Sequence, residues 1–190
     1  MISNNLFSLK GKTALVTGGS TGIGLMATVG LVSAGAKVFI VSRKLENCQN
    51  AAEELNNYGF EGEVIPFRGD LSSEAGINSI IDELYSKNSK LHILINNAGR
   101  TWGSDLSSFP YDAWAKVLNL NVSAIFYLTQ KLVPLLASSS KSDFPSRVVN
   151  IGSVMGEVPM GDGAYSYAAS KSAVHHITRI LAKELAEQNI

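Results

Sequence analysis

Short apolar runs rich in β-branched residues recur along this chain, and longer stretches with a different spacing separate them. Each run is continuously hydrophobic, as in VFIV or ILI, instead of alternating between apolar and polar positions. Runs of this kind and length are typical of strands that are buried on both faces of a sheet. The expected strands are residues 13–17, 37–41, 63–67, 91–96 and 147–152.

Apolar residues three or four positions apart predict helices between these strands. The spacing occurs in three sets: Leu45, Cys48, Ala52 and Leu55; Ile77, Ile80, Ile81 and Leu84; and Val122, Ile125, Phe126, Leu132, Val133 and Leu136. Alternating strands and helices form right-handed β-α-β units, so the expected fold class is α/β, with a doubly wound parallel sheet. Pro66 lies inside the third run, which suits the edge strand of the order 3-2-1-4-5.

Length and composition favour one globular domain and exclude several classes of partner. The 190 residues suffice for a sizeable core, and 16 basic side chains balance 16 acidic ones, so net charge favours neither nucleic acid nor an anionic membrane. The single cysteine, Cys48, cannot form an internal disulfide, which fits a reducing compartment. The start of the chain lacks the pattern of a signal peptide, and no apolar stretch approaches the length of a membrane span. We therefore expect a cytoplasmic protein.

A glycine-rich turn joins the first expected strand to the first helix in TALVTGGSTGIG. Gly18, Gly22 and Gly24 have the spacing G-x-x-x-G-x-G. Glycine permits a tight turn and a close approach of backbone amides to a pyrophosphate, which the helix N-terminus also attracts. The pattern predicts a dinucleotide site, and a plain glycine turn is the alternative.

The end of the second strand indicates which dinucleotide binds. An NAD site usually has an acidic residue there to hold the ribose 2′-hydroxyl, whereas this chain has Ser42, Arg43 and Lys44. The Arg43 guanidinium would instead bind a 2′-phosphate, which predicts NADP(H). Two alternatives stay open: Arg43 is only a solvated arginine, or Glu46 faces the ribose.

Two further segments reach the same edge of the expected sheet. Asp70, in GDL after the third strand, either accepts a hydrogen bond from the adenine amino group or caps the helix that begins near Ser73. The fourth strand ends in NNAG, residues 96–99, whose small side chains would admit a flat ring. Asn96 contacts the cofactor or stabilises the backbone of the turn, and the two roles can coexist.

Two Tyr-x-x-x-Lys pairs compete for a catalytic role. Tyr167 and Lys171 share one helix face and follow Ser153, which lies at the carboxyl end of the fifth strand. Tyr127 and Lys131 have the same spacing but follow no strand end, so packing or an interface is the expected role of that pair. Tyr165 lacks a lysine four residues later and is expected to line the substrate pocket or the start of the helix.

These motifs together resemble the short-chain dehydrogenase/reductase family, in its shorter form, over residues 9–190. The resemblance rests on TGGSTGIG, GDL, NNAG, NLNV, Ser153 and YAASK. It implies that Tyr167 is the general acid/base, that Lys171 assists it and binds the nicotinamide ribose, and that Ser153 donates to the substrate carbonyl. Asn121 would hold a proton-relay water. The implied contacts of the cofactor, NADP(H), are Gly18, Ser20, Thr21, Gly22, Ile23, Gly24, Arg43, Asp70, Leu71, Asn97, Ala98, Gly99, Tyr167 and Lys171.

Within that family the chain most resembles 3-oxoacyl-thioester reductases of the rhamnolipid-synthesis type. FSLKGKTALVTGG, NNAGRTWG, IGSVMG and LAKEL carry this resemblance. It implies reduction of a carbonyl, that of a 3-oxoacyl thioester, to a hydroxyl. Three positions depart from related patterns: Phe144 and Gln188 stand where carrier-protein-using reductases often have arginines, and Thr21 stands where many NADPH enzymes have arginine.

The resemblance also bears on completeness and assembly. Residues 1–190 would form a single NAD(P)-binding, Rossmann-like domain that stops after the active-site helix, without the C-terminal strands and the substrate loop of the family. The resemblance implies a homodimer or homotetramer in which the helices bearing Asn121 and Tyr167 pack against a neighbouring subunit. These helices carry apolar positions beyond one core-facing stripe: Leu128, Leu135, Ile177 and Ile180. A non-catalytic module that binds NADP(H) and regulates a partner is the alternative from another class.

No metal site is expected. His92, His175 and His176 lack the carboxylate or cysteine neighbours that would make them metal ligands, and we expect them to be structural.

Overall fold

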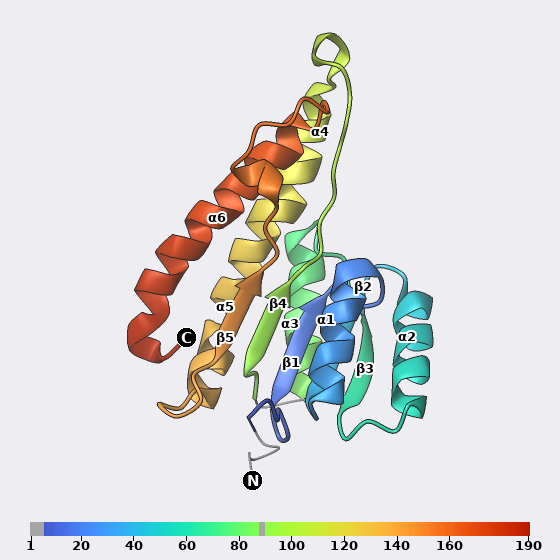
Figure 1. The fold of residues 1–190 in the computed structure, drawn as a ribbon, viewed down its shortest axis with the longest axis vertical. Helices are drawn as coiled ribbons and strands as arrows, with labels where there is room; N and C mark the ends of the chain where they lie inside the picture. The colour runs from blue at the N-terminus through green and yellow to red at the C-terminus, as the bar shows by residue number, and fades with distance from the viewer. Residues whose placement is uncertain (1–5, 88–89) are drawn as a thin grey trace.

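The computed structural model describes residues 6–87 and 90–190. Within these residues a five-stranded parallel sheet has the order β3-β2-β1-β4-β5 (Figure 1). Its strands are β1 Thr13–Thr17, β2 Lys37–Ser42, β3 Glu63–Arg68, β4 Ile93–Asn96 and β5 Arg147–Asn150. The expected fold class is confirmed, and Pro66 lies in an edge strand as its missing N–H requires. The absence of a signal peptide was inferred partly from residues 1–5, which lie outside the described residues.

Helices follow the strands and cover both faces of the sheet (Figure 1). The α-helices are α1 Gly22–Ser33, α2 Leu45–Asn57, α3 Glu74–Lys87, α4 Tyr111–Leu118, α5 Ala124–Ser139 and α6 Tyr165–Leu185. The shorter elements are η1 Leu106–Ser108, the π-helical η2 Asn119–Ser123, η3 Val154–Gly156 and η4 Ala186–Gln188.

The sheet separates two hydrophobic clusters because successive side chains of a strand point to opposite faces. On β1, Ala14 and Val16 pack with residues of α1 and α2, such as Val32 and Leu55. Leu15 points the other way, into a cluster that α3 and α5 complete. The continuous hydrophobicity of the expected strands thus has its cause in burial on both faces.

The segment Tyr111–Ser139 is one continuous helix, which the sequence pattern did not reveal at its full length. It runs through α4, η2 and α5, and by length and composition alone it could cross a membrane, so the expectation that no apolar stretch has that length is wrong. Its inner face forms part of the core, where Leu128, Leu132 and Leu136 are fully buried. A helix packed into the core of a fold meets the same criterion, so this one carries no argument for a membrane.

Two of the residues expected on an outer apolar face belong to the core. Leu128 is 0% and Leu135 is 4% exposed, and both lie in the cluster between α5, α3 and the sheet. Of the four residues on which the expected oligomer rested, Ile180 is clearly exposed. Leu128 and Leu135 therefore give no support to an interface.

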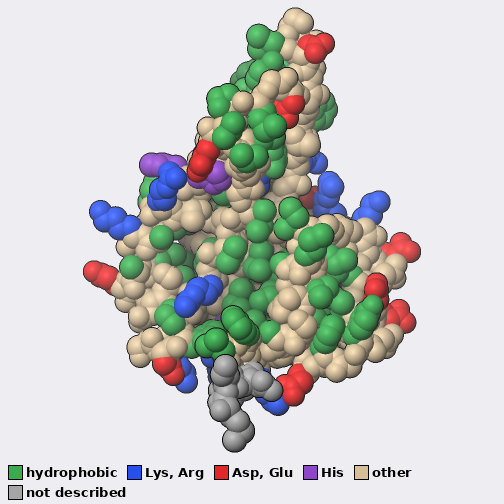
Figure 2. Space-filling model, in the orientation of Figure 1, with side chains coloured by type: hydrophobic (Ala, Val, Ile, Leu, Met, Phe, Trp, Pro, Cys, Tyr) green, Lys and Arg blue, Asp and Glu red, His purple; other side chains and the backbone are tan. Residues whose placement is uncertain are grey.

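The upper part of the molecule projects beyond the sheet and carries exposed apolar side chains. α4, the start of α6 and the loops joined to them form this projection (Figure 1), and hydrophobic side chains gather on it (Figure 2). They include Leu106, Tyr111, Val158 and Met160, with exposed fractions of 76%, 93%, 50% and 55%. An apolar surface of this kind, next to the carboxyl edge of the sheet, marks a region for binding.

We expect a polypeptide that ends at Ile190 to self-associate and to lack activity. In the described part of the chain β5 pairs only with β4, so its other edge presents unpaired backbone groups, which template association between sheets. Val149 on this strand is 42% exposed. Sedimentation of a polypeptide of residues 1–190 at micromolar concentration checks this, and Val149→Lys should reduce the association. A monodisperse, active product would contradict the prediction.

Candidate functional site

The loops at the carboxyl ends of the parallel strands bring most of the predicted site residues to one edge of the sheet. The glycine-rich turn leaves β1 there, and Gly18 and Gly22 have φ angles of +65° and +54°, a region that favours glycine. Ser20 is buried, whereas Thr21, Gly22 and Ile23 are exposed at the N-terminus of α1. Exposed amides at a helix N-terminus form a site for an anion.

Gly24 packs too closely against the turn to carry a side chain. A Cβ there would lie 2.2 Å from the Gly18 carbonyl oxygen and 2.5 Å from Nδ2 of Asn97. Only glycine fits at residue 24, and its lack of a side chain lets α1 approach the turn closely. This close approach sets where the N-terminus of the helix lies.

We expect Gly24→Ala to lower the free energy of unfolding by about 1–3 kcal/mol, because the added methyl group overpacks this contact. Gly30→Ala is the matched control on the same helix, since a Cβ at Gly30 meets no atom within 4 Å. The control should gain about 0.5–1 kcal/mol from the better helix propensity of alanine. Urea unfolding of the two variants measures both effects, and equal stability of the two would contradict the packing argument.

Asn97 ties the NNAG segment to the glycine-rich turn. Its Nδ2 donates to the carbonyl oxygens of Thr17 and Gly18 at 2.9 and 3.2 Å, and Oγ1 of Thr17 accepts from the amides of Asn97 and Ala98, both at 2.9 Å. Asn96 is buried, and its Nδ2 donates to Thr129 and Asn150, so its side chain is structural. The side chain links β4 to α5 and β5 instead of bonding the turn backbone, and its contact with the cofactor stays a prediction.

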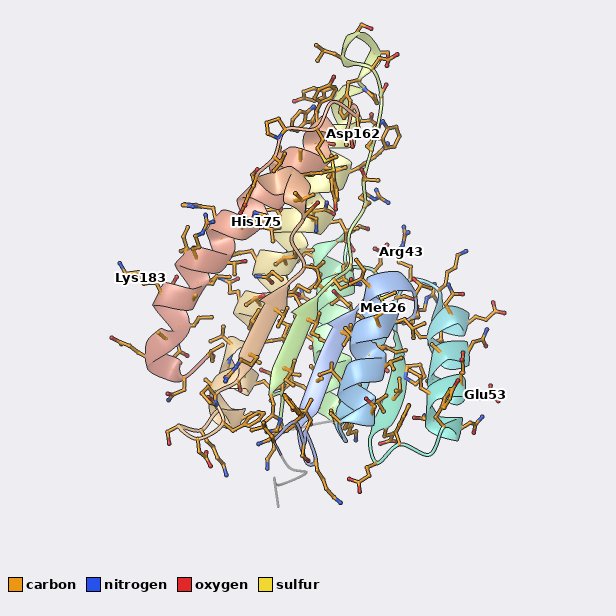
Figure 3. The ribbon with its side chains drawn as sticks, in the orientation of Figure 1. Met26, Arg43, Glu53, Asp162, His175 and Lys183 are labelled. Atoms are coloured by element: carbon orange, nitrogen blue, oxygen red, sulfur yellow. The ribbon has the colours of Figure 1, made fainter. Side chains whose placement is uncertain are left out.

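Arg43 borders two adjoining pockets beside the glycine-rich turn. One, of about 540 Å³, is lined by Gly18, Ser20, Thr21, Ser42, Arg43, Lys44 and Asn47. The other, of about 290 Å³, adds Asp70, Leu71, Asn97, Ala98, Gly99 and Arg100. The first pocket has two cationic side chains and no carboxylate in its lining, and Glu46 lines neither pocket. Figure 3 shows Arg43 at this upper edge, whereas Glu53 lies toward the other end of α2.

Asp70 points into the smaller of these pockets and does not cap α3. Its Oδ1 accepts from the Ser72 hydroxyl at 2.7 Å and from the Ser72 amide at 2.9 Å, and these bonds hold the pKa of the carboxyl below its usual value. The positive charges of Arg43 and Arg100 act in the same direction, and burial opposes them. Oγ of Ser73 accepts from the Gly76 amide and caps the helix instead, so the capping role proposed for Asp70 is wrong.

Asn121 is fully buried in the π-helical η2 between α4 and α5. Its Oδ1 accepts from the Arg100 amide, and its Nδ2 donates to the Arg100 carbonyl oxygen and to Oγ of Ser170, each at 2.9 Å. Single π-helical turns inside α-helices are frequent at functional sites. Asn121 thus ties the NNAG segment to α6, and its role toward a relay water stays a prediction.

Tyr167 and Lys171 line one pocket of about 490 Å³ at the carboxyl edge. The same pocket is lined by Ile23, Asn97, Gly99, Arg100, Thr101, Ile151, Gly152, Met155, Asp162 and Ala164. Nζ of Lys171 lies 5.5 Å from the centre of the Tyr167 ring and donates to the Ile151 carbonyl oxygen at 2.6 Å. Burial of Lys171, which is 5% exposed, lowers the pKa of its ammonium group, because burial disfavours the charged form.

Ser153 lies between two residues of this pocket lining, Gly152 and Met155. Its backbone is extended at the start of η3, and its Oγ accepts from the Met155 amide at 3.2 Å. Elements far apart in the sequence therefore bring together the glycine-rich turn, the NNAG segment, Ser153, Tyr167 and Lys171.

Several pocket residues were not among the predicted ones. Lys44 and Asn47 border the larger pocket beside Arg43, and Ser72 and Arg100 border the smaller one. Lys44 could have been predicted from the sequence, because it is a second cation at the end of the second strand. No sequence pattern marks the other three as site residues, since only the turns of the chain bring them to the sheet edge.

The competing pair, Tyr127 and Lys131, lines none of the three pockets that Arg43, Asp70, Tyr167 and Lys171 border. The Tyr127 hydroxyl is 3.0 Å from Oε1 of Glu74 and 3.1 Å from Oδ1 of Asn78, both on α3. Tyr127 thus packs α5 against α3, which is one of the two roles expected for this pair. Tyr165 begins α6, and its ring packs edge-on against Phe109 at a centroid distance of 5.4 Å.

In the described part of the chain, no group of three His, Cys, Asp or Glu residues could hold a metal ion. Nδ1 of His92 accepts from the Thr13 amide at 3.0 Å and joins β4 to β1, and His176 is exposed.

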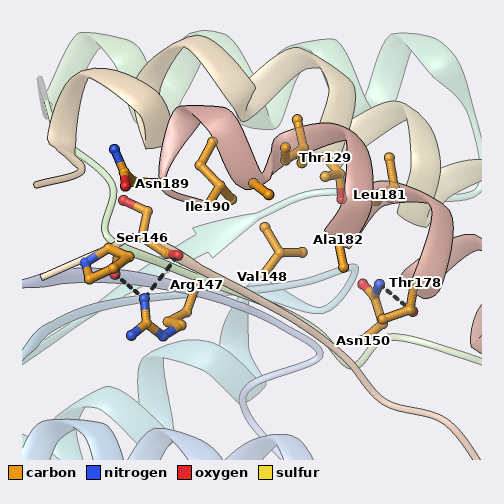
Figure 4. Close-up of a pocket in the computed structure, with 13 residues that line it drawn as sticks. Thr129, Ser146, Arg147, Val148, Asn150, Thr178, Leu181, Ala182, Asn189 and Ile190 are labelled. Carbon is orange, nitrogen blue, oxygen red and sulfur yellow. Dashed lines mark hydrogen bonds between the residues drawn. The ribbon is translucent and has the colours of Figure 1, made fainter. Parts of the chain in front are cut away.

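A further pocket of about 460 Å³ lies between β5 and α6, away from these groups (Figure 4). Val148, Leu181, Ala182 and Ile190 give it an apolar wall, and Asn150 donates to Thr178 at its end nearer the site. It borders the unpaired edge of β5 and contains none of the predicted site residues.

Comparison with known proteins connects this geometry to characterised enzymes. The short chain dehydrogenase family profile matches residues 12–190. A rhamnolipids biosynthesis 3-oxoacyl-(acyl-carrier-protein) reductase of Pseudomonas aeruginosa is 49% identical over 97% of this chain and 71% of its own length. The structure of the Pseudomonas aeruginosa RhlG/NADP active-site complex matches with a TM-score of 0.93 and 47% identity, over 99% of this chain and 72% of that one. A 5-keto-D-gluconate 5-reductase of Escherichia coli is 32% identical over 98% of this chain and 71% of its own length.

Proposed function

The chain belongs to the short chain dehydrogenase family and is an oxidoreductase, and from this premise we propose that it reduces the carbonyl of a 3-oxoacyl thioester to a hydroxyl with NADPH. One observation carries the proposal: Tyr167 and Lys171 line the same pocket as Gly99 and Gly152, and Ser153 lies beside it. A proton donor, a cation and a hydroxyl then surround a space that a carbonyl group can enter.

The residues at the edge of the sheet fit NADP(H). The close approach at Gly24 leaves room for backbone only, as a turn around a pyrophosphate requires. Arg43 and Lys44, with Asn47, would hold a 2′-phosphate in the pocket that lacks a carboxylate, and Asp70 would accept from the adenine amino group. Ser20, Thr21, Gly22 and Ile23 would surround the pyrophosphate, while Leu71 and Ala98 would border the adenine.

The chemistry is divided between the cofactor and the side chains. A bound NADPH supplies the hydride. Tyr167 donates its hydroxyl proton to the carbonyl oxygen, and Oγ of Ser153 donates a hydrogen bond to the same oxygen as negative charge develops there. The Lys171 ammonium, fixed on the Ile151 carbonyl oxygen, stabilises the phenolate that Tyr167 becomes. The Asn121 side chain bonds the backbone of Arg100, directly after NNAG, and the Ser170 hydroxyl on α6, and so fixes the distance between these two segments.

The surroundings of the pocket favour an acyl substrate. Met155 lines the pocket, and Val154, Val158 and Met160, which are close to Met155 in the sequence, are 64%, 50% and 55% exposed. An apolar rim of this kind binds a hydrocarbon chain by removing it from water. The relative from Pseudomonas aeruginosa, with its 3-oxoacyl substrate class, supports the same choice.

Cofactor oxidation over a panel of carbonyl compounds tests the proposal. We would follow NADPH absorbance with 3-oxoacyl thioesters of several chain lengths, simple ketones and 5-keto-D-gluconate, and repeat the panel with NADH. The expected result is the highest kcat/KM with NADPH and a 3-oxoacyl thioester. A preference for 5-keto-D-gluconate or a simple ketone would overturn the substrate class, and binding of NADPH without turnover of any substrate would favour the non-catalytic regulatory module.

We also propose a cytoplasmic homodimer or homotetramer. The exposed apolar side chains Tyr111, Phe126 and Ile180 on α4, α5 and α6 support an interface, with exposed fractions of 93%, 44% and 49%. A monomer in sedimentation of the active protein at micromolar concentration would contradict this assembly.

A further inference from the structure

One face of α6 holds the segment that carries Ser153. Tyr167, Lys171 and His175 are spaced four residues apart, so their side chains lie along the same face of the helix. Nζ of Lys171 donates to the carbonyl oxygen of Ile151, before Ser153. The Ser172 hydroxyl donates to the carbonyl oxygen of Gly156, after it. The third contact comes from His175 and is made to Ser153 itself.

His175 contacts Ser153 through its imidazole ring. The Ser153 amide donates to Nε2 of His175 at 3.4 Å, a long contact of a kind that often tightens when an active site is occupied. His175 lies on α6 directly beside the loop that leads from β5 into η3 (Figure 3). Its side chain is only 23% exposed.

The glycines on either side of Ser153 fit the imidazole closely. A Cβ on Gly152 would lie 2.4 Å from Nε2 of His175. A Cβ on Gly156 would lie 2.8 Å from the backbone carbonyl carbon of Lys171 and 2.9 Å from Cε1 of His175. Neither glycine has a positive φ angle, so turn conformation does not explain them. At Gly152 the room for the ring does, because a side chain there would push the loop away from His175, whereas at Gly156 the close approach of the α6 backbone contributes as well.

The contacts of the ring define which nitrogen carries the proton. Since Nε2 accepts from the Ser153 amide, it has no hydrogen, and the neutral ring holds its proton on Nδ1. Oε1 of Glu157 is 3.4 Å from Nδ1 and has the right charge to face that proton, but the two atoms are not aligned as a hydrogen bond, and Nδ1 is buried without another partner. Nη2 of Arg179 lies 3.9 Å from the same carboxylate oxygen.

We infer that His175 is a positioning residue for the reaction: its Nε2 holds the Ser153 backbone at the distance from Tyr167 that carbonyl reduction requires. The inference rests on the proposed function, because Ser153 and Tyr167 must act on one carbonyl oxygen. Both residues are then tied to the same face of α6: Tyr167 is part of the helix, and the Ser153 backbone is held through His175. A shift of the Ser153 loop by about 1 Å can lower the rate of reaction by about 100-fold.

Three substitutions separate this role from packing alone. His175→Leu keeps an apolar side chain between the glycines but removes the acceptor. His175→Gln keeps an acceptor oxygen near the position of Nε2, and His176→Leu changes the adjacent, exposed histidine as the matched control. Two measurements are made on each variant in the active protein: hydrogen exchange of the Ser153 amide by NMR without ligands, and kcat, KM and the Kd of NADPH.

With His175→Leu we expect faster exchange of the Ser153 amide and a kcat lower by about 10- to 100-fold, while the Kd of NADPH stays within about twofold, since the loop is displaced but the cofactor contacts remain. His175→Gln should restore slow exchange and most of kcat, and His176→Leu should match the parent protein. The Gln variant tests the inference even if the Leu variant does not fold.

Unchanged exchange of the Ser153 amide in His175→Leu would overturn the inference, as would faster exchange with an unchanged kcat. A kcat as low in His175→Gln as in His175→Leu would overturn the role of the acceptor. If the parent protein reduces none of the carbonyl compounds, the proposed function fails. The exchange measurement then still decides whether His175 holds Ser153.

Discussion

Tyr167→Phe is expected to lower kcat for carbonyl reduction by about 10²- to 10⁴-fold, because the substitution removes the hydroxyl that donates the proton and leaves the ring in place. The Kd of NADPH should stay near that of the parent protein, since the other residues that line the cofactor pockets are unchanged. Single-turnover assays and fluorescence titration of NADPH measure the two quantities separately.

Tyr127→Phe is the matched control, because Tyr127 also precedes a lysine by four residues. Its hydroxyl lies near Glu74 and Asn78 on α3, and its removal should leave kcat within about twofold of the parent value while reducing stability by about 0.5–1.5 kcal/mol, the usual net contribution of one hydrogen bond. Equal losses of kcat in the two variants would remove the assignment of Tyr167 as proton donor.

Arg43→Ala is expected to weaken NADPH binding by roughly 10- to 150-fold and to leave NADH binding nearly unchanged. The reason is the loss of a charge-assisted contact with the 2′-phosphate, which contributes about 1.5–3 kcal/mol and which NADH cannot make. Dissociation constants of both cofactors, measured at one ionic strength, give the ratio directly.

Arg68→Ala serves as the control for a general effect of charge. Arg68 is exposed at the end of the neighbouring strand β3 and lines neither pocket that Arg43 borders. It should change the binding of both cofactors by less than about twofold. If Arg43→Ala weakens NADH as much as NADPH, Arg43 does not contact the phosphate.

The elements of this fold are largely visible in the sequence. Runs such as VFIV and ILI predict strands buried on both faces, and the structure confirms all five expected strands within a few residues of their expected ends. Pro66 marks the edge strand because a missing N–H is a local property of one residue. The continuity of the helix Tyr111–Ser139 was not visible, because the π-helical turn at Asn119–Ser123 shifts the apolar spacing that reveals a helix.

The outer and inner faces of the long helices were harder to predict. Leu128 and Leu135 are core residues although their spacing suggested an outer face. A helix that packs against both a sheet and a second helix buries more than one stripe, and the width of that buried face depends on its neighbours.

The candidate site, like the fold, could be predicted only in part from the sequence. Its motifs, the glycine-rich turn, Arg43, NNAG, Ser153 and the Tyr167–Lys171 pair, are local patterns whose chemistry follows from residue type and spacing. The sequence by itself therefore determined the family, the elements and the residues to test.

Only the tertiary structure decided the contacts between these motifs. It showed that Asp70 bonds to Ser72 instead of capping α3, that Asn96 is structural, and that His175 reaches the Ser153 amide. Each of these contacts depends on the distance between two segments, and that distance is set by how helices pack on the sheet rather than by the residues of either segment. A hydrogen bond forms or fails over a few tenths of an ångström, a precision that no local pattern carries.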